Sequence, residues 1–264
     1  MEPRRFRIKG DDGVVISYLV FTGKEPSVVI LHGLAGSGGE FIPTAQALGG
    51  RHVILVDQRG HGQSTRSPGD TSREAYVRDA MLVIEQAASG PVDLVGQSLG
   101  AHTAMLVAAG HPHVVRRLVL LETDEGGNSG EDPIALRDFF RSWEVPFATR
   151  ETAREALGDT PLAAAWAADL EEREDGFHPR FDPEVMASAI THVSTPRRAE
   201  WESIAAPTLV VFADGGMLSE DRKRAFVANR PNAYRVDLRG ASHDAHLDAF
   251  GQWVAAVHEF LSAP

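Results

Sequence analysis

The five residues G-Q-S-L-G at positions 96–100 constrain the fold of this chain more than any other segment. They follow an apolar run, P-V-D-L-V at 91–95, and precede a run of helix-forming residues at 101–109. A G-x-S-x-G sequence between a strand and a helix is typical of a nucleophile elbow, a turn so tight that glycine is needed at both ends. Such a turn would hold the hydroxyl of Ser98 at the carboxyl edge of a sheet and at a helix N-terminus. The alternative is a glycine-rich turn in which the serine only caps the helix.

Apolar runs elsewhere predict a parallel sheet that is covered by helices on both faces. The runs at 28–31 and 53–56 contain only branched aliphatic residues and do not alternate with polar ones, as in strands that are buried on both sides. Strands are expected at 14–20, 28–31, 52–56, 92–95, 117–122, 208–212 and 234–238, and helices at 40–48, 72–88, 101–109, 220–229 and 245–261. This alternation predicts an α/β fold with a doubly wound sheet, in which ligands bind at the carboxyl ends of the strands.

The segment 126–203 interrupts this alternation, because it has no β-rich run and is helical in composition. We therefore predict a helical cap inserted into a core formed by 1–125 and 204–264, with a flexible hinge at 126–133 (G-G-N-S-G-E-D-P). Aromatic side chains of the cap either build its own small core or form the apolar wall of a pocket over the sheet edge. The candidates for the pocket wall are Phe139, Phe140, Trp143, Trp166 and Phe177.

Composition and charge exclude several kinds of partner and chemistry. The chain has 264 residues and a formal net charge of -11, which argues against nucleic acid and against an anionic membrane surface. It has no cysteine, which excludes disulfides, thiolate metal sites and cysteine nucleophiles. The histidines form no H-E-x-x-H motif and the acidic cluster at 171–175 contains its own arginine, so we expect no metal and no cofactor. Since no signal peptide or long apolar run is visible, we expect a cytoplasmic protein, monomeric or homodimeric.

A serine hydroxyl needs a base before it can act as a nucleophile, and a histidine near the C-terminus is the expected base if the order is serine, acid, histidine. The segment G-A-S-H-D-A-H at 240–246 offers His243 and His246. His243 follows a predicted strand and a short turn, which places it on a loop at the carboxyl edge, whereas His246 would lie about one turn into the next helix. We therefore predict His243 as the general base. We expect His32 and His61 to be structural hydrogen-bonding groups.

Backbone amides are expected to form an oxyanion hole, because their N–H groups are already oriented. One is the amide of Leu99, directly after the serine. The other should come from the glycine-rich loop at 32–39, and we choose the amide of Leu34. The alternative function of this loop, a phosphate cradle, is weaker because the lysine of G-x-x-x-x-G-K-[ST] is missing.

In order and spacing, four segments resemble the α/β-hydrolase fold family: H-G-L-A-G at 32–36, D-Q-R-G-H-G-Q-S at 57–64, G-Q-S-L-G at 96–100 and G-A-S-H-D at 240–244. The resemblance spans nearly the whole chain except the predicted cap. It implies Ser98 as nucleophile, His243 as base, and the amides of Leu34 and Leu99 as oxyanion donors. It does not fix the substrate, because esterases, lactonases, C–C bond hydrolases and some amidases share this equipment.

The acid that would orient the base departs from the usual pattern of this family. That pattern is P-x-L-x-x-x-G-x-x-D, but here the last position holds Gly216, and Asp214 lies two residues early, a displacement of ~6–7 Å along an extended chain. A second location known in the fold is the end of the preceding strand, where L-V-L-L-E at 118–122 ends in Glu122. A carboxylate at the end of a buried strand must find a partner. We therefore predict Glu122 as the acid, with Asp214, and then Asp124 or another group, as alternatives.

Two groups within the family resemble the chain at this strand end. Some haloalkane dehalogenases carry a glutamate there but use an aspartate nucleophile, so Ser98 does not imply dehalogenation. Lactonases that open zearalenone combine an acid at this position with a serine nucleophile. The expected function is a cofactor-independent serine hydrolase that cleaves a small or medium apolar carboxylic ester or lactone. The alternatives are C–C bond cleavage of a ring-fission product, a ligand-sensing module with slow turnover, and a cofactor-free oxygenase.

Overall fold

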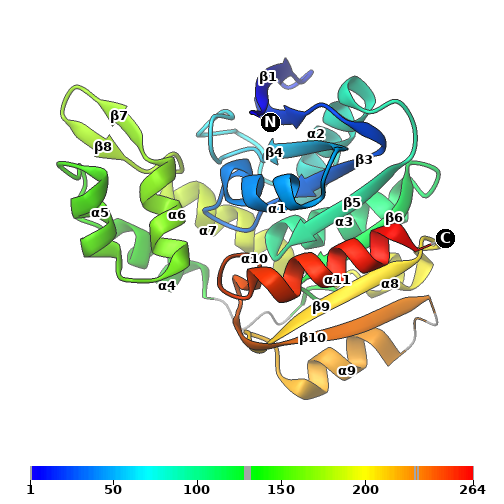
Figure 1. Ribbon diagram of the computed structural model, residues 1–264. Helices are drawn as coiled ribbons and strands as arrows, with labels where there is room; N and C mark the ends of the chain where they lie inside the picture. Colours follow the sequence, from blue (N-terminus) through cyan, green and yellow to red (C-terminus); the bar gives the residue numbers. More distant parts are fainter. Residues whose placement is uncertain (1, 128–131, 229, 231, 264) are drawn as a thin grey trace.

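A mostly parallel sheet lies at the centre of the molecule (Figure 1). The computed structural model describes residues 2–127, 132–228, 230 and 232–263. Within these residues the sheet has eight strands in the order β1-β2-β4-β3-β5-β6-β9-β10. The β1–β2 and β2–β4 pairs are antiparallel and the others are parallel. The strands are β1 (Arg4–Lys9), β2 (Val15–Phe21), β3 (Lys24–Leu31), β4 (Arg51–Asp57), β5 (Val92–Gln97), β6 (Val115–Leu121), β9 (Thr208–Gly215) and β10 (Ala233–Ser242). The predicted α/β fold class is confirmed.

Helices cover both faces of this sheet, and alternate residues of the central strands pack beneath different helices. On β3, Val29 and Leu31 belong to one apolar cluster, whereas Val28 and Ile30 belong to the other. The first cluster includes side chains of α2 (Arg73–Ala87), α3 (Leu99–Gly110), α8 (Arg198–Ser203) and α9 (Glu220–Ala228). The second includes side chains of α1 (Ile42–Ala47) and α11 (Phe250–Ser262). Because both faces exclude water, the strand sequences are apolar throughout instead of alternating.

Two elements of the core differ from the sequence-based expectation. Strand β1 was not expected, since its sequence R-R-F-R-I-K is rich in basic residues and its side chains are mostly exposed at the edge of the sheet. The single helix predicted at 245–261 is two helices, α10 (Ala245–Asp248) and α11, because the backbone at Ala249 is not helical (φ -114°, ψ 35°). No helix among the described residues has the length and apolarity needed to cross a membrane.

The segment between β6 and β9 forms a lobe to one side of the sheet (Figure 1). It is mainly helical, as predicted, but it also contains a short antiparallel hairpin that the sequence did not indicate. Its elements are α4 (Pro133–Arg141), α5 (Arg150–Leu157), α6 (Pro161–Asp169), β7 (Glu171–Arg173), β8 (Gly176–His178), α7 (Pro183–Thr191) and the short 3-10 helix η2 (His192–Ser194). Part of the predicted hinge, residues 128–131, lies outside the described residues. Helix α8 packs on the core instead, with Trp201 stacked on Phe226 at 4.0 Å.

Three helices of this lobe begin with the same local signal. Asp132, Thr160 and Asp182 each accept a hydrogen bond from a backbone N–H of the first turn, and a proline follows each of them at the first helical position. Proline fits there because its missing N–H would have no helical acceptor. Pro133, Pro161 and Pro183 therefore begin helices in this lobe and do not interrupt them.

The turn between β5 and α3 brings backbone atoms unusually close together. A Cβ at Gly96 would lie 2.4 Å from the carbonyl oxygen of Gly100, and a Cβ at Gly100 would lie 2.2 Å from that of Leu31. Between them Ser98 has φ 51° and ψ -118°, in a region that non-glycine residues rarely adopt. The two glycines therefore permit the contact between helix and strand that fixes the serine.

This contact predicts opposite effects for two glycines of the same helix. We expect Gly100→Ala to lower the free energy of unfolding by about 1–3 kcal/mol, because the new methyl group meets backbone that cannot rotate away. Gly110→Ala, at a position where a Cβ would have nothing within 4 Å, should raise it by up to about 1 kcal/mol. Urea unfolding of both variants measures the difference. Equal stability of the two would contradict the close approach of α3 to β3.

Candidate active site

Ser98 lies half-buried at the carboxyl edge of the sheet, between the end of β5 and the first turn of α3. Its amide donates a hydrogen bond to the carbonyl of Leu121 on β6 at 2.8 Å, which ties the strained turn to the neighbouring strand. A residue held in such a conformation costs about 1–3 kcal/mol, and this cost is typical of functional sites. The elbow predicted from the sequence is thus present as a strained turn with the serine at its apex.

Glu122 lies directly after β6, also at positive φ (51°), and its carboxylate is almost completely buried. Among the described residues, two backbone N–H groups and one imidazole nitrogen contact the carboxylate. The backbone N–H groups of Ala213 and Met217 donate hydrogen bonds at 2.8 and 3.1 Å, and Nδ1 of His243 lies 3.3 Å from Oε2. Backbone donors of this kind hold a carboxylate in one orientation. Glu122 is therefore fixed by the strand beside it and faces the imidazole.

The alternative acids have other partners. The carboxylate of Asp214 accepts hydrogen bonds from the amides of Gly240 and Ala241 at 3.0 and 3.1 Å, and these N–H groups lower its pKa. The carboxylate of Asp124 pairs with Arg222 and accepts a hydrogen bond from the amide of Gly126. These contacts give both carboxylates a structural role.

Position 216, where the family usually carries the acid, is a glycine, and the position of Glu122 explains why. A Cβ built on Gly216 would lie 2.2 Å from Oε2 of Glu122. The carboxylate of Glu122 therefore fills the space into which a side chain at 216 would project. The two positions therefore depend on each other, because the side chain of Glu122 fits only if residue 216 has none.

His243 lies on the loop between β10 and α10, as predicted, with its side chain partly exposed. His246 is fully buried and stacked on Phe41 at 4.3 Å, with Nε2 3.6 Å from Glu40. Burial lowers the pKa of His246 to about 4, so it is neutral at pH 7. His32 is also buried, and its Nε2 accepts a hydrogen bond from the amide of Gln58 at 3.0 Å.

The amides of Leu34 and Leu99 are available to a ligand. Neither N–H donates a hydrogen bond to any group within the part of the chain that the structure describes. Leu99 is the first residue of α3, where helical amides lack intrahelical acceptors and the helix dipole favours negative charge. Leu34 follows Gly33, and both line a cavity that also contains Ser98 and His243.

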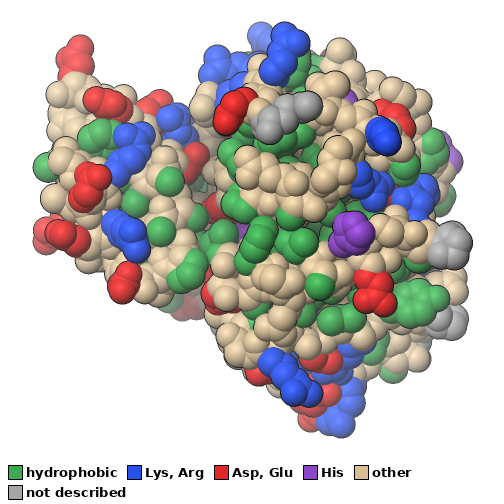
Figure 2. Space-filling view, in the orientation of Figure 1, with side chains coloured by type: hydrophobic (Ala, Val, Ile, Leu, Met, Phe, Trp, Pro, Cys, Tyr) green, Lys and Arg blue, Asp and Glu red, His purple; other side chains and the backbone are tan. Residues whose placement is uncertain are grey.

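Two cavities bounded by described residues meet at Ser98, Met217 and His243. The larger, of about 140 Å³, is lined on the lobe side by Leu136, Phe139, Phe140, Leu162 and Trp166. The other is lined by apolar residues of η2, α7 and the loop after β9, namely Ile190, Val193, Met217 and Leu218. Figure 2 shows a furrow between the lobe and the core. Acidic and basic side chains both lie on the surface of the lobe in this view.

Two aromatic residues predicted for the pocket wall do not line these cavities. Trp143 lies behind the wall, 5.3 Å from the Phe140 ring and 5.1 Å from that of Trp166. Phe177 lies on the hairpin under the guanidinium group of Arg150, at 4.5 Å. The apolar lining from α7 and from the loop after β9 was not anticipated, because nothing in those sequences distinguishes a cavity wall from an ordinary core. Among the described residues, no group of acidic and histidine side chains is arranged to hold a metal ion.

Residues 26–250 match the model of the α/β hydrolase fold family. The chain belongs to this family. A curated relative, the sn-1-specific diacylglycerol lipase ABHD11 of Mus musculus, is 30% identical over 94% of this chain and 85% of its own length. The 2-succinyl-6-hydroxy-2,4-cyclohexadiene-1-carboxylate synthase of Yersinia pestis bv. Antiqua (strain Nepal516) is 30% identical over 90% of this chain and 88% of the relative.

Solved structures share the fold over their whole length. The crystal structure of E-2-(acetamidomethylene)succinate hydrolase has a TM-score of 0.89 to this chain, with 23% sequence identity over 99% of this chain and 100% of the other. At this level of identity the likeness shows the fold alone.

The contacts of the two candidate acids predict different consequences for activity. Glu122→Gln keeps the shape of the side chain but removes the charge that faces His243, and we expect it to lower kcat/KM for a chromogenic ester by at least about 10²-fold. Asp214→Asn retains one oxygen acceptor for the amides of Gly240 and Ala241 and should stay within about threefold of the unaltered protein. Urea unfolding serves as the control for folding. Loss of activity in Asp214→Asn alone would show that the acid is misassigned.

The shared space at 122 and 216 predicts that the acid can be moved. Glu122→Gly, which tolerates the positive φ, should be nearly inactive. Adding Gly216→Asp to it should restore kcat/KM at least about tenfold, because the carboxylate then enters from the loop after β9. Gly216→Asp alone should unfold at lower urea concentration, since two side chains compete for one volume. A double variant no more active than Glu122→Gly would contradict this interpretation.

Proposed function

We propose that this chain is a cofactor-independent serine hydrolase that cleaves a neutral carboxylic ester or lactone through an acyl-enzyme on Ser98. The observation that carries the proposal is the carboxylate–imidazole contact of 3.3 Å between Glu122 and His243, at cavities that Ser98 also lines. A serine, a histidine and a buried carboxylate at the carboxyl edge of one sheet are the groups needed for nucleophilic acyl transfer.

In the proposed reaction His243 accepts the proton of the Ser98 hydroxyl as the oxygen attacks the substrate carbonyl. Glu122 holds the imidazole in the tautomer with the proton on Nδ1 and stabilises the imidazolium that forms. The amides of Leu34 and Leu99 donate hydrogen bonds to the oxyanion of the tetrahedral intermediate. His243 then protonates the leaving alcohol, and later activates the water that hydrolyses the acyl-enzyme.

The charges around the cavities favour an uncharged substrate. Glu40, Glu122, Asp124 and Asp244 line them, whereas no lysine or arginine does so among the described residues. Burial raises the pKa of Glu40 to about 7 and also raises the pKa of Asp244, because each loses water around its charged form. A carboxylate on the substrate would meet Glu40 and Asp244 with no lysine or arginine among the described lining residues to offset their charge. Among the relatives, this fits the lipase better than the synthase, whose name describes a carboxylate product.

The apolar wall supports the same substrate class. Phe139, Phe140 and Trp166 face the reacting serine across a small cavity, which suits a short or medium acyl chain better than a polymer. Two alternative functions use the same fold. A C–C bond hydrolase would turn over a ring-fission product and not an ester, and a ligand-sensing module would bind its ligand with slow turnover.

Burst kinetics test the proposed reaction. With p-nitrophenyl butyrate we expect a burst of p-nitrophenol equivalent to one active site, followed by steady turnover. Both should disappear after treatment with a serine-reactive organophosphate and in Ser98→Ala. Turnover of a ring-fission diketone in preference to every ester, or binding of esters without a burst, would contradict the proposal.

The buried acids predict a pH-dependent preference. We expect kcat/KM for p-nitrophenyl butyrate to exceed that for the p-nitrophenyl hemisuccinate ester by at least about tenfold at pH 8. The ratio should fall as the pH drops through about 7, because protonation of Glu40 removes a negative charge that repels the anionic ester. Glu40→Gln should give a smaller ratio that no longer changes near pH 7, whereas Asp237→Asn, at an exposed position of β10, should leave the profile unaltered. A constant ratio in the unaltered protein would show that Glu40 does not influence substrate choice.

A further inference from the structure

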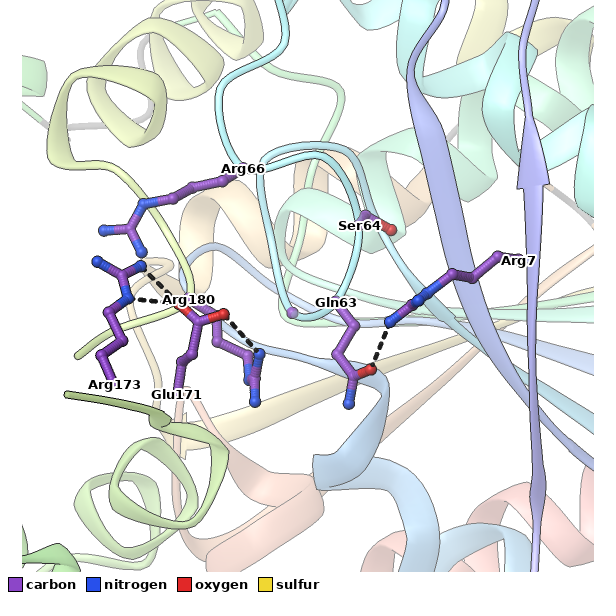
Figure 3. Close-up of a pocket in the computed structure, with 8 residues that line it drawn as sticks. Arg7, Gln63, Ser64, Arg66, Glu171, Arg173 and Arg180 are labelled. Atoms are coloured by element: carbon purple, nitrogen blue, oxygen red, sulfur yellow. Dashed lines mark hydrogen bonds and ion pairs between the residues drawn. The ribbon is translucent and has the colours of Figure 1, made fainter. Parts of the chain in front are cut away.

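Another hollow lies between the β7–β8 hairpin of the lobe and the core, and it shares no lining residue with the two cavities at Ser98. Its volume is about 280 Å³. Four of the described residues that line it are arginines and one is acidic: Arg7, Arg66, Arg173, Arg180 and Glu171 (Figure 3). Such a concentration of positive charge is unusual in a chain whose formal net charge is -11.

Carboxylates lie near only two of the four arginines of this arginine crevice within the described ranges: Arg173 and Arg180 contact Glu171, and Arg180 also lies 3.9 Å from Asp169. Glu171 accepts a hydrogen bond from Nε of Arg173 at 2.7 Å and lies 3.6 Å from Nη1 of Arg180. Arg66 donates to the carbonyl of Pro179, and Arg7 donates to the side-chain oxygen of Gln63 at 3.1 Å. Neither of these two arginines forms an ion pair with a carboxylate within the described ranges of the chain.

Two of the guanidinium groups repel each other. Figure 3 shows Arg66 and Arg173 pointing toward one another from opposite segments. Burial and the charge of Arg173 lower the pKa of Arg66, although Asp182 and Glu171 act in the opposite direction. An anion placed between guanidinium groups removes such repulsion and accepts hydrogen bonds from both.

We propose that the arginine crevice binds a small phosphate-bearing molecule. Arginine donors approach from both sides of the crevice in Figure 3, which matches the acceptors of a tetrahedral oxyanion. The volume lies at the small end of the range for ligand pockets and suits one or two phosphate groups better than a nucleotide.

The ligand would connect the lobe with the core. Arg173 lies on the hairpin and Arg180 follows it, whereas Arg7 lies on β1 and Arg66 in the loop after β4. Figure 2 shows Lys and Arg side chains on both sides of the furrow that separates the lobe from the core. An occupied crevice therefore holds the hairpin against the core by charge-assisted hydrogen bonds from both parts.

Calorimetric titration of the full chain with pyrophosphate, against chloride at equal ionic strength, tests the proposal. We expect saturable binding of one pyrophosphate per chain. Arg66→Gln should weaken it at least about tenfold, and so should Arg173→Gln, which alters an exposed side chain and its ion pair with Glu171. The matched control Arg224→Gln, at an exposed position of α9, should bind within about twofold of the unaltered protein.

Two further measurements test which kind of anion binds and whether it binds at the hairpin. Citrate tests a carboxylate ligand, and we expect it to bind at least about tenfold more weakly than pyrophosphate. Backbone hydrogen exchange in 171–178 should slow when pyrophosphate is bound. Absence of saturation, equal binding by Arg66→Gln and Arg224→Gln, tighter binding of citrate, or unchanged exchange in the hairpin would each overturn the proposal. Hydrolysis of p-nitrophenyl butyrate is scored separately, so these outcomes do not bear on the proposed function.

Discussion

The contact between the first turn of α3 and the ends of β3 and β5 is the constraint on which the rest of this structure depends. It requires that position 100 carry no side chain, because a Cβ there would lie 2.2 Å from the carbonyl oxygen of Leu31. The same contact forces Ser98 into its strained conformation and leaves the amide of Leu99 at an open helix end. The proposed nucleophile and one predicted oxyanion donor thus owe their positions to backbone packing, which side-chain motion cannot disturb.

The sheet could be predicted from the sequence wherever a strand is buried on both faces, since a continuous run of branched aliphatic residues such as 53–56 is typical of such strands. The edge strand β10 was also predicted, at 234–238, but the other edge strand and the hairpin of the lobe gave no such signal. Strand β1 is largely basic and exposed, and the three-residue strands of the β7–β8 hairpin are too short for periodicity to register. Their positions follow from tertiary contacts that a single sequence does not encode locally.

The residues of the candidate site also fall into those that the sequence predicts and those that it does not. The serine, the histidine and Glu122 were predicted because each sits in a short motif with a strand or helix beside it. Glu122 is also a charged residue at the end of an apolar strand, where its carboxylate needs a partner. The apolar lining from α7 and from the loop after β9 could not be predicted, because Ile190 and Met217 reach the cavity only after distant elements have packed together. The sequence also could not predict why residue 216 is a glycine, because the reason is the packing of Glu122 against it in the folded chain.

The attachment of the Glu122 carboxylate to the end of β6 has a consequence for the loop after β9. In the usual pattern of the family, the acid is carried by the loop after β9, so any insertion or deletion there displaces a reacting group. Here the carboxylate is attached to a central strand, and that loop contributes only the amide of Met217 to it. A change in that loop should therefore alter the cavity wall, which Met217 and Leu218 line, while Glu122 keeps its attachment to β6 and its hydrogen bond from the amide of Ala213.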